Sequence, residues 1–187
     1  PCRHRNPLQS VLRKSLSSCR RCQGSFLHLF PRVAVITSTD ADHLDIYCCE
    51  SAVRDAFREF ASHVADTLIL NIRLDLQSKH IKADNILTYG YDRPEADFWA
   101  KPTENGHFDL HYPGGVIEDC VVGIPGWVNI ENGVAAAAMA LTYGIEPEKI
   151  RAALASFKGV KRRFDTQLEE DGLVYIDDYA HHPTEIQ

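Results

Sequence analysis

Apolar residues in the first half of the chain form two short runs on either side of an amphipathic segment. Val33–Ile36 is mostly β-branched and follows Pro31, a pattern typical of a buried parallel strand. Apolar residues then recur at helical spacing between Ala52 and Val64, with charged residues on the opposite face. Thr67–Ile72 is the second apolar run. The order strand, helix, strand predicts a βαβ unit and therefore a parallel sheet.

The middle of the chain changes to short runs separated by turn residues. Ile86–Tyr89 predicts a further strand. Within residues 96–122, Gly and Pro punctuate apolar runs at Asp97–Ala100 and Phe108–Tyr112, which predicts antiparallel strands joined by turns. We therefore expect an antiparallel subsheet beside the parallel strands.

Two helices are predicted in the second half. The first runs from about Asn129 to Tyr143 through an alanine-rich core and stops at Gly144. The second opens at Pro147, a residue favoured in the first helical turn, and ends at Gly159. We expect its buried face to consist of Ile150, Leu154 and Phe157.

The last part of the chain predicts a hairpin. Phe164–Leu168 and Leu173–Ile176 flank the polar segment Glu169–Gly172. These patterns together place the chain in the α/β class, with a mostly parallel sheet, helices and an antiparallel subsheet.

Composition narrows the classes of function. Hydrophobic residues make up 44% and charged residues 25% of the 187, as in an ordinary globular protein. No apolar run approaches the roughly 20 residues that span a bilayer, and the N-terminus lacks the apolar region of a secretory signal. We therefore expect a cytoplasmic protein without a membrane partner.

The net charge of −6 is unevenly distributed. Residues 1–24 carry six basic side chains and no acidic one, which leaves −12 on the rest of the chain. An acidic body argues against nucleic acid as a partner. The basic end is typical of a disordered tail, with a polyanion-binding tail and a targeting peptide as alternatives. Its Cys19-x-x-Cys22 pair has no second pair that would complete a zinc ribbon.

A cluster of acidic residues follows the first predicted strand. Within Thr37–Asp45, three aspartates and His43 fall in six consecutive positions. Loops at the carboxyl ends of parallel strands bind ligands, and Mg²⁺ prefers oxygen ligands to which an imidazole can add a nitrogen. The loop is therefore a candidate metal site. The alternative is a solvated acidic loop in which Asp45 caps the next helix.

A second polar cluster, Asp177–Pro183, follows the apolar run Leu173–Ile176 in the same way. Its carboxylates can accept hydrogen bonds from ribose hydroxyls, and His181 and His182 can contact phosphate or a polar substrate. The alternative is a turn with surface histidines.

Two further segments place polar or basic side chains next to predicted elements. In Pro125–Asn132, at a helix start, Asn129 is a good N-cap, so a capping role is the simpler interpretation. Lys161–Arg163 follows Gly159, and a guanidinium suits phosphate or carboxylate, although a solvated basic turn is the commoner arrangement.

In this order and spacing, four segments resemble motifs of the Mur ligase family. Asp40–Asp45 resembles its "ADHxD" motif, and Pro125–Asn132, with the alanines that follow, resembles its adenine-side motif. Gly159–Phe164 resembles the junction into its third domain, and Asp178–Pro183 resembles its "DYxHHP" motif. The resemblance covers Ser25–Gln187, and four motifs in register are more specific than any one of them.

The resemblance implies a division into domains. Mur ligases have a UDP-substrate domain, a central ATPase domain and a Rossmann-like C-terminal domain. Residues 25–158 would form part of the central domain, and residues 159–187 the first strands of the third. Residues 1–24 would be a disordered or frame-shifted tail, because the family has an acidic metal ligand where this chain has Ser18–Cys22.

The resemblance also implies that ATP and Mg²⁺ are the cofactors. His43 would be a ligand of Mg²⁺, and Asn129 and Asn132 would contact adenine. Asp178 would hold the ribose of the nucleotide.

The remaining residues of the implied site surround the reacting groups. Arg163 would reach toward the nucleotide and stabilise the transferred phosphoryl group, with Arg162 as a close competitor for this part. His181 would be catalytic, and Tyr179 and His182 would contact the substrates.

By resemblance, the substrates are UDP-N-acetylmuramate and L-alanine, which are joined through an acyl phosphate. The alternatives are a branch of the family that adds a recycled peptide to the same nucleotide sugar, and a non-catalytic remnant. The sequence has no Gly-Lys-Thr or Gly-Lys-Ser phosphate-binding loop, and Val128 stands where family members often have His. We therefore expect these residues alone to be inactive as a ligase.

Overall fold

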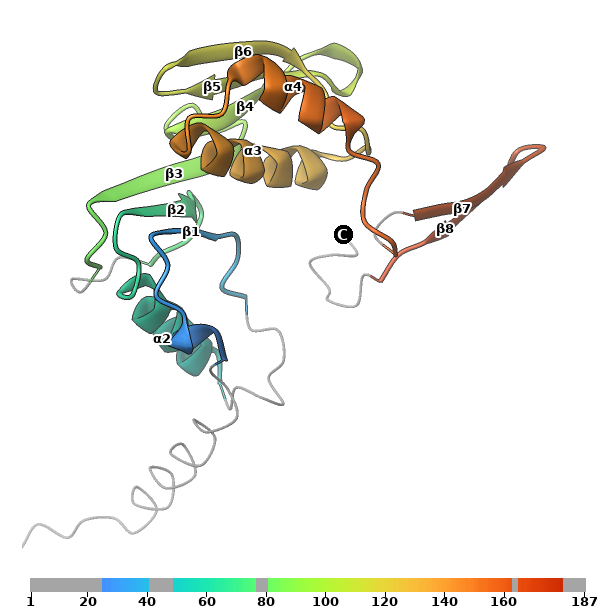
Figure 1. Ribbon diagram of the computed structural model, residues 1–187. Coiled ribbons are helices and arrows are strands. Elements are labelled where there is room, and N and C mark those ends of the chain that lie inside the picture. Colours follow the sequence, from blue (N-terminus) through green and yellow to red (C-terminus); the bar gives the residue numbers. More distant parts are fainter. Residues whose placement is uncertain (1–24, 41–48, 77–80, 163–164, 180–187) are drawn as a thin grey trace, which may run out of the picture. The chain divides into compact units, whose positions relative to one another are not determined.

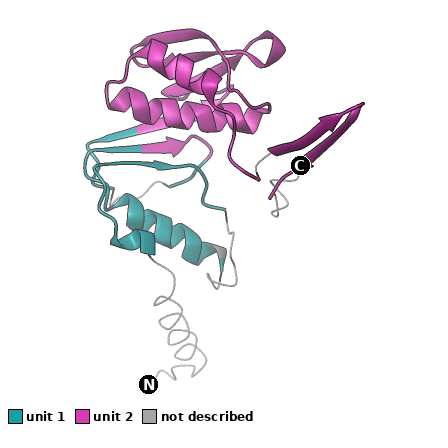
Figure 2. Ribbon diagram, turned by 45° about the vertical axis from the view of Figure 1, so that its right-hand side comes forward, with its two compact units in different colours: residues 1–68, 74–86 teal, residues 69–73, 87–187 magenta. Residues whose placement is uncertain are grey.

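The computed structural model describes residues 25–40, 49–76, 81–162 and 165–179 (Figure 1). The chain divides into two compact units, one of residues 1–68 and 74–86 and the other of residues 69–73 and 87–187 (Figure 2). The predicted α/β class is confirmed, since strands β1 to β6 follow one another in one sheet and β7 and β8 form a second.

The strands are β1 (Val33–Ile36), β2 (Thr67–Asn71), β3 (Asn85–Tyr91), β4 (Phe98–Pro102), β5 (Phe108–Tyr112), β6 (Gly115–Cys120), β7 (Asp165–Glu170) and β8 (Leu173–Asp177). The α-helices are α2 (Glu50–Ala61), α3 (Trp127–Thr142) and α4 (Pro147–Ser156), and the short 3₁₀ helices are η1 (Ser25–His28) and η2 (Glu104–Gly106).

In the first unit, α2 packs its apolar face against the aromatic residues before β1. Phe26 of η1 stacks on Phe57 at 5.4 Å and meets Phe60 edge-on at 5.6 Å between ring centroids. The helix ends three residues before the predicted Val64. The reason is local: the N–H groups of His63 and Val64 donate to carbonyls three residues back, which tightens the chain into a turn.

In the second unit, the predicted antiparallel subsheet is confirmed. Strands β4 and β5 are antiparallel, with Trp99 opposite His111, and β5 and β6 are also antiparallel, whereas β3 and β4 are parallel. One face of these strands is buried and is made of Phe98, Ala100, Phe108, Leu110, Ile117 and Cys120. The residues alternate in β4 and β5, whereas Ile117 and Cys120 of β6 are three positions apart because the register between β5 and β6 shifts. Helix α3 packs against β4 and α4 packs against β6, so the two helices cover this subsheet side by side (Figure 1).

Two predicted helix boundaries are wrong. Helix α3 begins at Trp127, with Gly126 as its N-cap at φ +107°, so Asn129 is not the cap. The Asn129 amide instead donates to the Pro125 carbonyl at 2.5 Å. Helix α4 ends at Ser156, and Phe157 is its C-cap and 42% exposed rather than part of the buried face. The extended backbone of Phe157, with ψ at 118°, turns the chain out of the helix two residues before Gly159.

Candidate functional site

Five of the nine predicted site residues belong to the part of the chain that the structure describes. These are Asn129, Asn132, Arg162, Asp178 and Tyr179. The other four lie outside the described residues: His43, Arg163, His181 and His182. The described site residues occur in two places, at the start of α3 and at the base of the β7–β8 hairpin.

The start of α3 presents amide side chains to solvent. Asn132 is exposed and Asn129 is half-buried, and they are three residues apart, so they lie on neighbouring positions of one helix face. No side chain caps the first turn, which begins at Gly126 with a positive φ that favours glycine. The Asn129 amide nitrogen is already engaged with the Pro125 carbonyl. Asn132 is therefore the residue of this pair that is better placed to meet a ligand.

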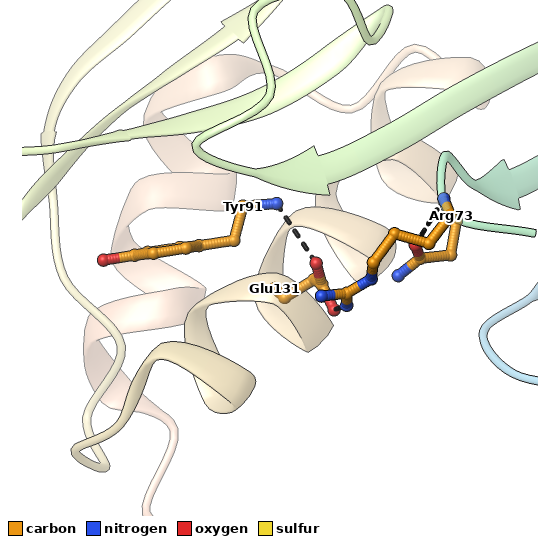
Figure 3. A network of polar contacts seen from close by, with 4 residues as sticks. Arg73, Tyr91 and Glu131 are labelled. Carbon is orange, nitrogen blue, oxygen red and sulfur yellow. Dashed lines mark hydrogen bonds and ion pairs between the residues drawn. The ribbon is translucent and has the colours of Figure 1, made fainter.

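In the sequence, the buried residue Glu131 lies between these two asparagines. Glu131 is 7% exposed, and its Oε1 accepts a hydrogen bond from the Tyr91 backbone N–H at 3.2 Å. Its Oε2 accepts a hydrogen bond from Nη2 of Arg73, with which it forms an ion pair (Figure 3). The Arg73 backbone N–H donates in turn to Oδ1 of Asn71 at 3.0 Å. One side chain thus ties α3 to the end of β3 and to the segment that follows β2.

The ring of Trp127 lies near this ion pair. The Arg73 guanidinium lies 5.5 Å from the centroid of the Trp127 ring, within the range of a cation–π contact. The Tyr91 ring lies 6.1 Å from the same indole. Because Trp127 remains 50% exposed, its indole is both part of this network and open to solvent.

Glu131 and Arg73 were not among the predicted site residues, although the sequence contains a signal for them. Glu131 shares the buried stripe of α3 with Val134, Ala135 and Ala138, at helical spacings of three, four and seven. A single acid in such a stripe requires a buried partner. Arg73, directly after the apolar run Thr67–Ile72, is a basic residue at a strand end that can provide one.

Tyr89 extends the same network into the core. Burial raises the pKa of its hydroxyl from 10.0 to about 12, and the charge of Glu131 adds to this rise while a hydrogen bond with Asn71 opposes it. The neutral hydroxyl is therefore favoured in the folded protein. The neutral Tyr89 hydroxyl makes its full contribution to the free energy of unfolding below pH 10, and this contribution is lost as the pH rises toward 12.

We expect a Tyr89→Phe variant to be less sensitive to alkali than the unsubstituted chain. Between pH 10 and pH 12 the unsubstituted chain should lose about 1.4 kcal/mol per pH unit more than the variant, because Tyr89 ionises in its unfolded state while it stays neutral in the folded state. Urea unfolding at several pH values measures the difference. Parallel pH profiles of the two proteins would contradict it, since the other tyrosines titrate in both.

At the base of the hairpin, Arg162 lies between the start of β7 and the end of β8. Its backbone is left-handed at φ +62°, its N–H donates to Asp165 Oδ2 at 3.1 Å, and its carbonyl accepts from the Tyr179 N–H at 2.9 Å. The guanidinium lies 4.6 Å from the centroid of the Tyr179 ring and 3.6 Å from the Asp177 carboxylate. The structure thus brings together Arg162 and Tyr179, and Asp178, which directly precedes Tyr179, is exposed.

Most of the predicted metal site lies outside the described residues: of the loop Thr37–Asp45, only residues 37–40 are described, and His43 is not among them. Within the described ranges, no group of three His, Cys, Asp or Glu side chains is arranged to hold a metal ion. Two described cysteines, Cys49 and Cys120, are free thiols, and the Cys19–Cys22 pair lies outside the described part. No helix in the described part has both the length and the apolar character to cross a membrane.

The chain is an α/β protein in which the exposed amide side chain of Asn132 and the half-buried one of Asn129 stand at the start of α3, and comparison with known proteins gives its family. The model of the Mur ligase middle domain family matches residues 16–140. The chain therefore belongs to the Mur ligase family.

Individual relatives agree with this assignment. The chain is 44% identical over 165 residues to the UDP-N-acetylmuramate–L-alanine ligase of Flavobacterium johnsoniae. The matched residues make up 87% of this chain and 35% of that protein. The chain is 48% identical over 166 residues to the ligase of the same name from Flavobacterium psychrophilum, covering 87% and 36%. The crystal structure of MurF from Acinetobacter baumannii superposes with a TM-score of 0.74 at 23% identity over 88% of this chain and 38% of that one, a likeness in fold. The chain spans about a third of the length of the curated relatives it matches.

Proposed function

We propose that this chain is part of an ATP-dependent ligase that joins L-alanine to UDP-N-acetylmuramate in peptidoglycan precursor synthesis. The observation that carries the proposal is the identity of 40% to 48% with several proteins that bear this name, over 87% of the chain. In such a reaction the muramate carboxylate is activated by phosphoryl transfer, the amine of L-alanine attacks it, and phosphate leaves as the amide forms. The proposal places the reaction in the cytoplasm, where ATP is the co-substrate.

The start of α3 is the part of the structure that best fits a nucleotide. A nucleobase offers donors and acceptors at its edge, and the exposed Asn132 amide supplies one of each. We assign Asn132, with Asn129 behind it, to adenine, and Asp178 to the ribose. The proposal requires that these side chains meet around one nucleotide.

The base of the hairpin supplies the second part of the proposed site. Arg162 and Tyr179 are held together there by a backbone hydrogen bond and a cation–π contact. Arg162 or Arg163 would stabilise charge on the transferred phosphoryl group, as Mg²⁺ bound by His43 would do when present. His181 would act at the reacting groups, and Tyr179 and His182 would contact the substrates. The proposed boundary between the central domain, residues 25–158, and the third domain, residues 159–187, falls in the connection between α4 and β7.

Nucleotide binding tests the proposal. We expect ATP with Mg²⁺ to bind the purified chain in isothermal titration calorimetry, and an Asn132→Ala variant to bind about tenfold more weakly, because it loses a hydrogen bond to the base. Asn85→Ala is the matched control, since Asn85 is also exposed but lies at the start of β3, and it should leave binding unchanged.

Ligation is measured in the same preparations as ADP release with UDP-N-acetylmuramate and L-alanine. No turnover is expected from these residues alone, because they contain no Gly-Lys-Thr or Gly-Lys-Ser loop to cradle the phosphates. Equal ATP binding by Asn132→Ala and the unsubstituted chain would contradict the assigned adenine contact. A folded chain that does not bind ATP at all would favour a non-catalytic remnant.

A further inference from the structure

The geometry points to Arg73 and Glu131 as positioning residues: we infer that the ion pair between the buried Glu131 and the half-exposed Arg73 fixes the rotation of α3 about its axis and so aims Asn132 at the nucleotide. The inference rests on the proposed function of the α3 start, and it assigns a part in nucleotide binding to two residues that do not themselves touch the nucleotide.

The first reason is the way the two carboxylate oxygens are used. Oε1 of Glu131 is held by the Tyr91 backbone N–H at the end of β3, and Oε2 by Arg73 after β2 (Figure 3). A side chain held at both oxygens by two different chain segments has little freedom to turn. Because Glu131 directly precedes Asn132 on the helix, fixing one side chain fixes the direction of the other, about 100° further around the axis.

The second reason is that the rest of α3 supplies little rotational control. Apart from Ile130 and Glu131, its buried surface is formed by Gly133, Val134, Ala135, Ala137 and Ala138, which are small residues. No side chain caps the first turn. Burial of such a surface is largely non-directional, whereas a hydrogen-bonded charge has a defined geometry. The polar pair is therefore the feature that specifies one orientation of the helix.

The third reason is that stability alone does not require this pair. Taking a carboxylate out of water is costly, and an apolar pair of similar volume often stabilises a protein as much or more. A buried acid in an otherwise apolar stripe is thus better explained by the geometry that it imposes. The same argument provides a way to separate stability from positioning.

The test is the double variant Arg73→Met with Glu131→Leu. We expect its midpoint of thermal unfolding to stay close to that of the unsubstituted chain, because removing the buried charge of Glu131 offsets the lost acceptor of the Tyr91 N–H. We expect its affinity for ATP with Mg²⁺ to fall about tenfold, because the helix start loses its fixed orientation. Glu131→Gln keeps the acceptor for the Tyr91 N–H and should lose less affinity than the double variant.

Two readouts make the outcome decisive. In the unsubstituted chain, we expect the side-chain amide NMR signals of Asn129 and Asn132 to be single and sharp, and in the double variant to shift or broaden, whether or not ATP is present. Wild-type ATP affinity in a stable double variant, or unchanged amide signals, would overturn the positioning role. A different result would overturn the proposed function of the site: the unsubstituted chain does not bind ATP, while the amide signals of Asn129 and Asn132 still change in the double variant. The ion pair would then have only a structural role.

Discussion

Replacing Phe108 by alanine is expected to lower the free energy of unfolding by about 4 kcal/mol. Phe108 is fully buried in β5, on the face of the subsheet that α3 and α4 cover, and it lies opposite Cys120 of β6 and Pro102 of β4. Truncation removes the apolar surface that the ring buries and leaves a cavity in a closely packed core. Urea unfolding followed by far-UV circular dichroism measures the change.

Phe157→Ala is the matched control for this prediction. It removes the same atoms from a ring that is 42% exposed at the end of α4, so it should cost about 1 kcal/mol. Equal losses in the two variants would show that the buried face of the subsheet does not provide the main packing energy of the second unit.

The spacing of apolar residues along the sequence predicts most helices and strands, because the residues that a helix or strand buries recur at a fixed spacing. β1 has the predicted bounds, and β4 and β5 alternate buried and more exposed residues as a subsheet with one covered face requires. The start of α3 could not be predicted from propensity. Asn129 is a strong capping residue, but the positive φ of Gly126 lets the chain enter the helix three residues earlier.

For the candidate site too, the short sequence segments predict some features, and others depend on the folded backbone. The motifs predicted Asn129, Asn132, Arg162, Asp178 and Tyr179 because each lies in a short segment next to a predicted element. The left-handed backbone of Arg162, which allows its contact with Tyr179, has no signature in residue type, since Arg rarely adopts a positive φ.

The ion pair between Arg73 and Glu131 is the clearest case of non-local information. The two residues are 58 positions apart, and only the packing of α3 beside the ends of β2 and β3 brings them together. Helical spacing shows that Glu131 is buried, but it does not say which basic residue is its partner. The order of the strands in the sheet identifies Arg73 as the partner of Glu131. In our inference, this pair sets the orientation of Asn132 at the start of α3.

Gly123→Ala is expected to destabilise the second unit by about 3 kcal/mol through a clash between backbone segments. A Cβ at this position would lie 2.1 Å from the carbonyl oxygen of Phe157 and 2.9 Å from that of Ala155. Both neighbours are main-chain atoms, so no side chain can move aside to make room. The Gly123 N–H also donates to the Leu154 carbonyl at 3.1 Å, a hydrogen bond at the end of α4 that the displaced chain would weaken.

The effect should reach the proposed nucleotide site, because Gly123 begins the short connection that leads to Gly126 and α3. We therefore expect Gly123→Ala to weaken ATP binding as well as to lower the urea midpoint. Gly172→Ala is the matched control: its Cβ would have no neighbour within 4 Å, and it should cost only about 1 kcal/mol for a left-handed backbone at φ +81°. If Gly123→Ala proves as stable as Gly172→Ala, the connection before α3 can move away from the carbonyl of Phe157 without cost, and the predicted clash is wrong.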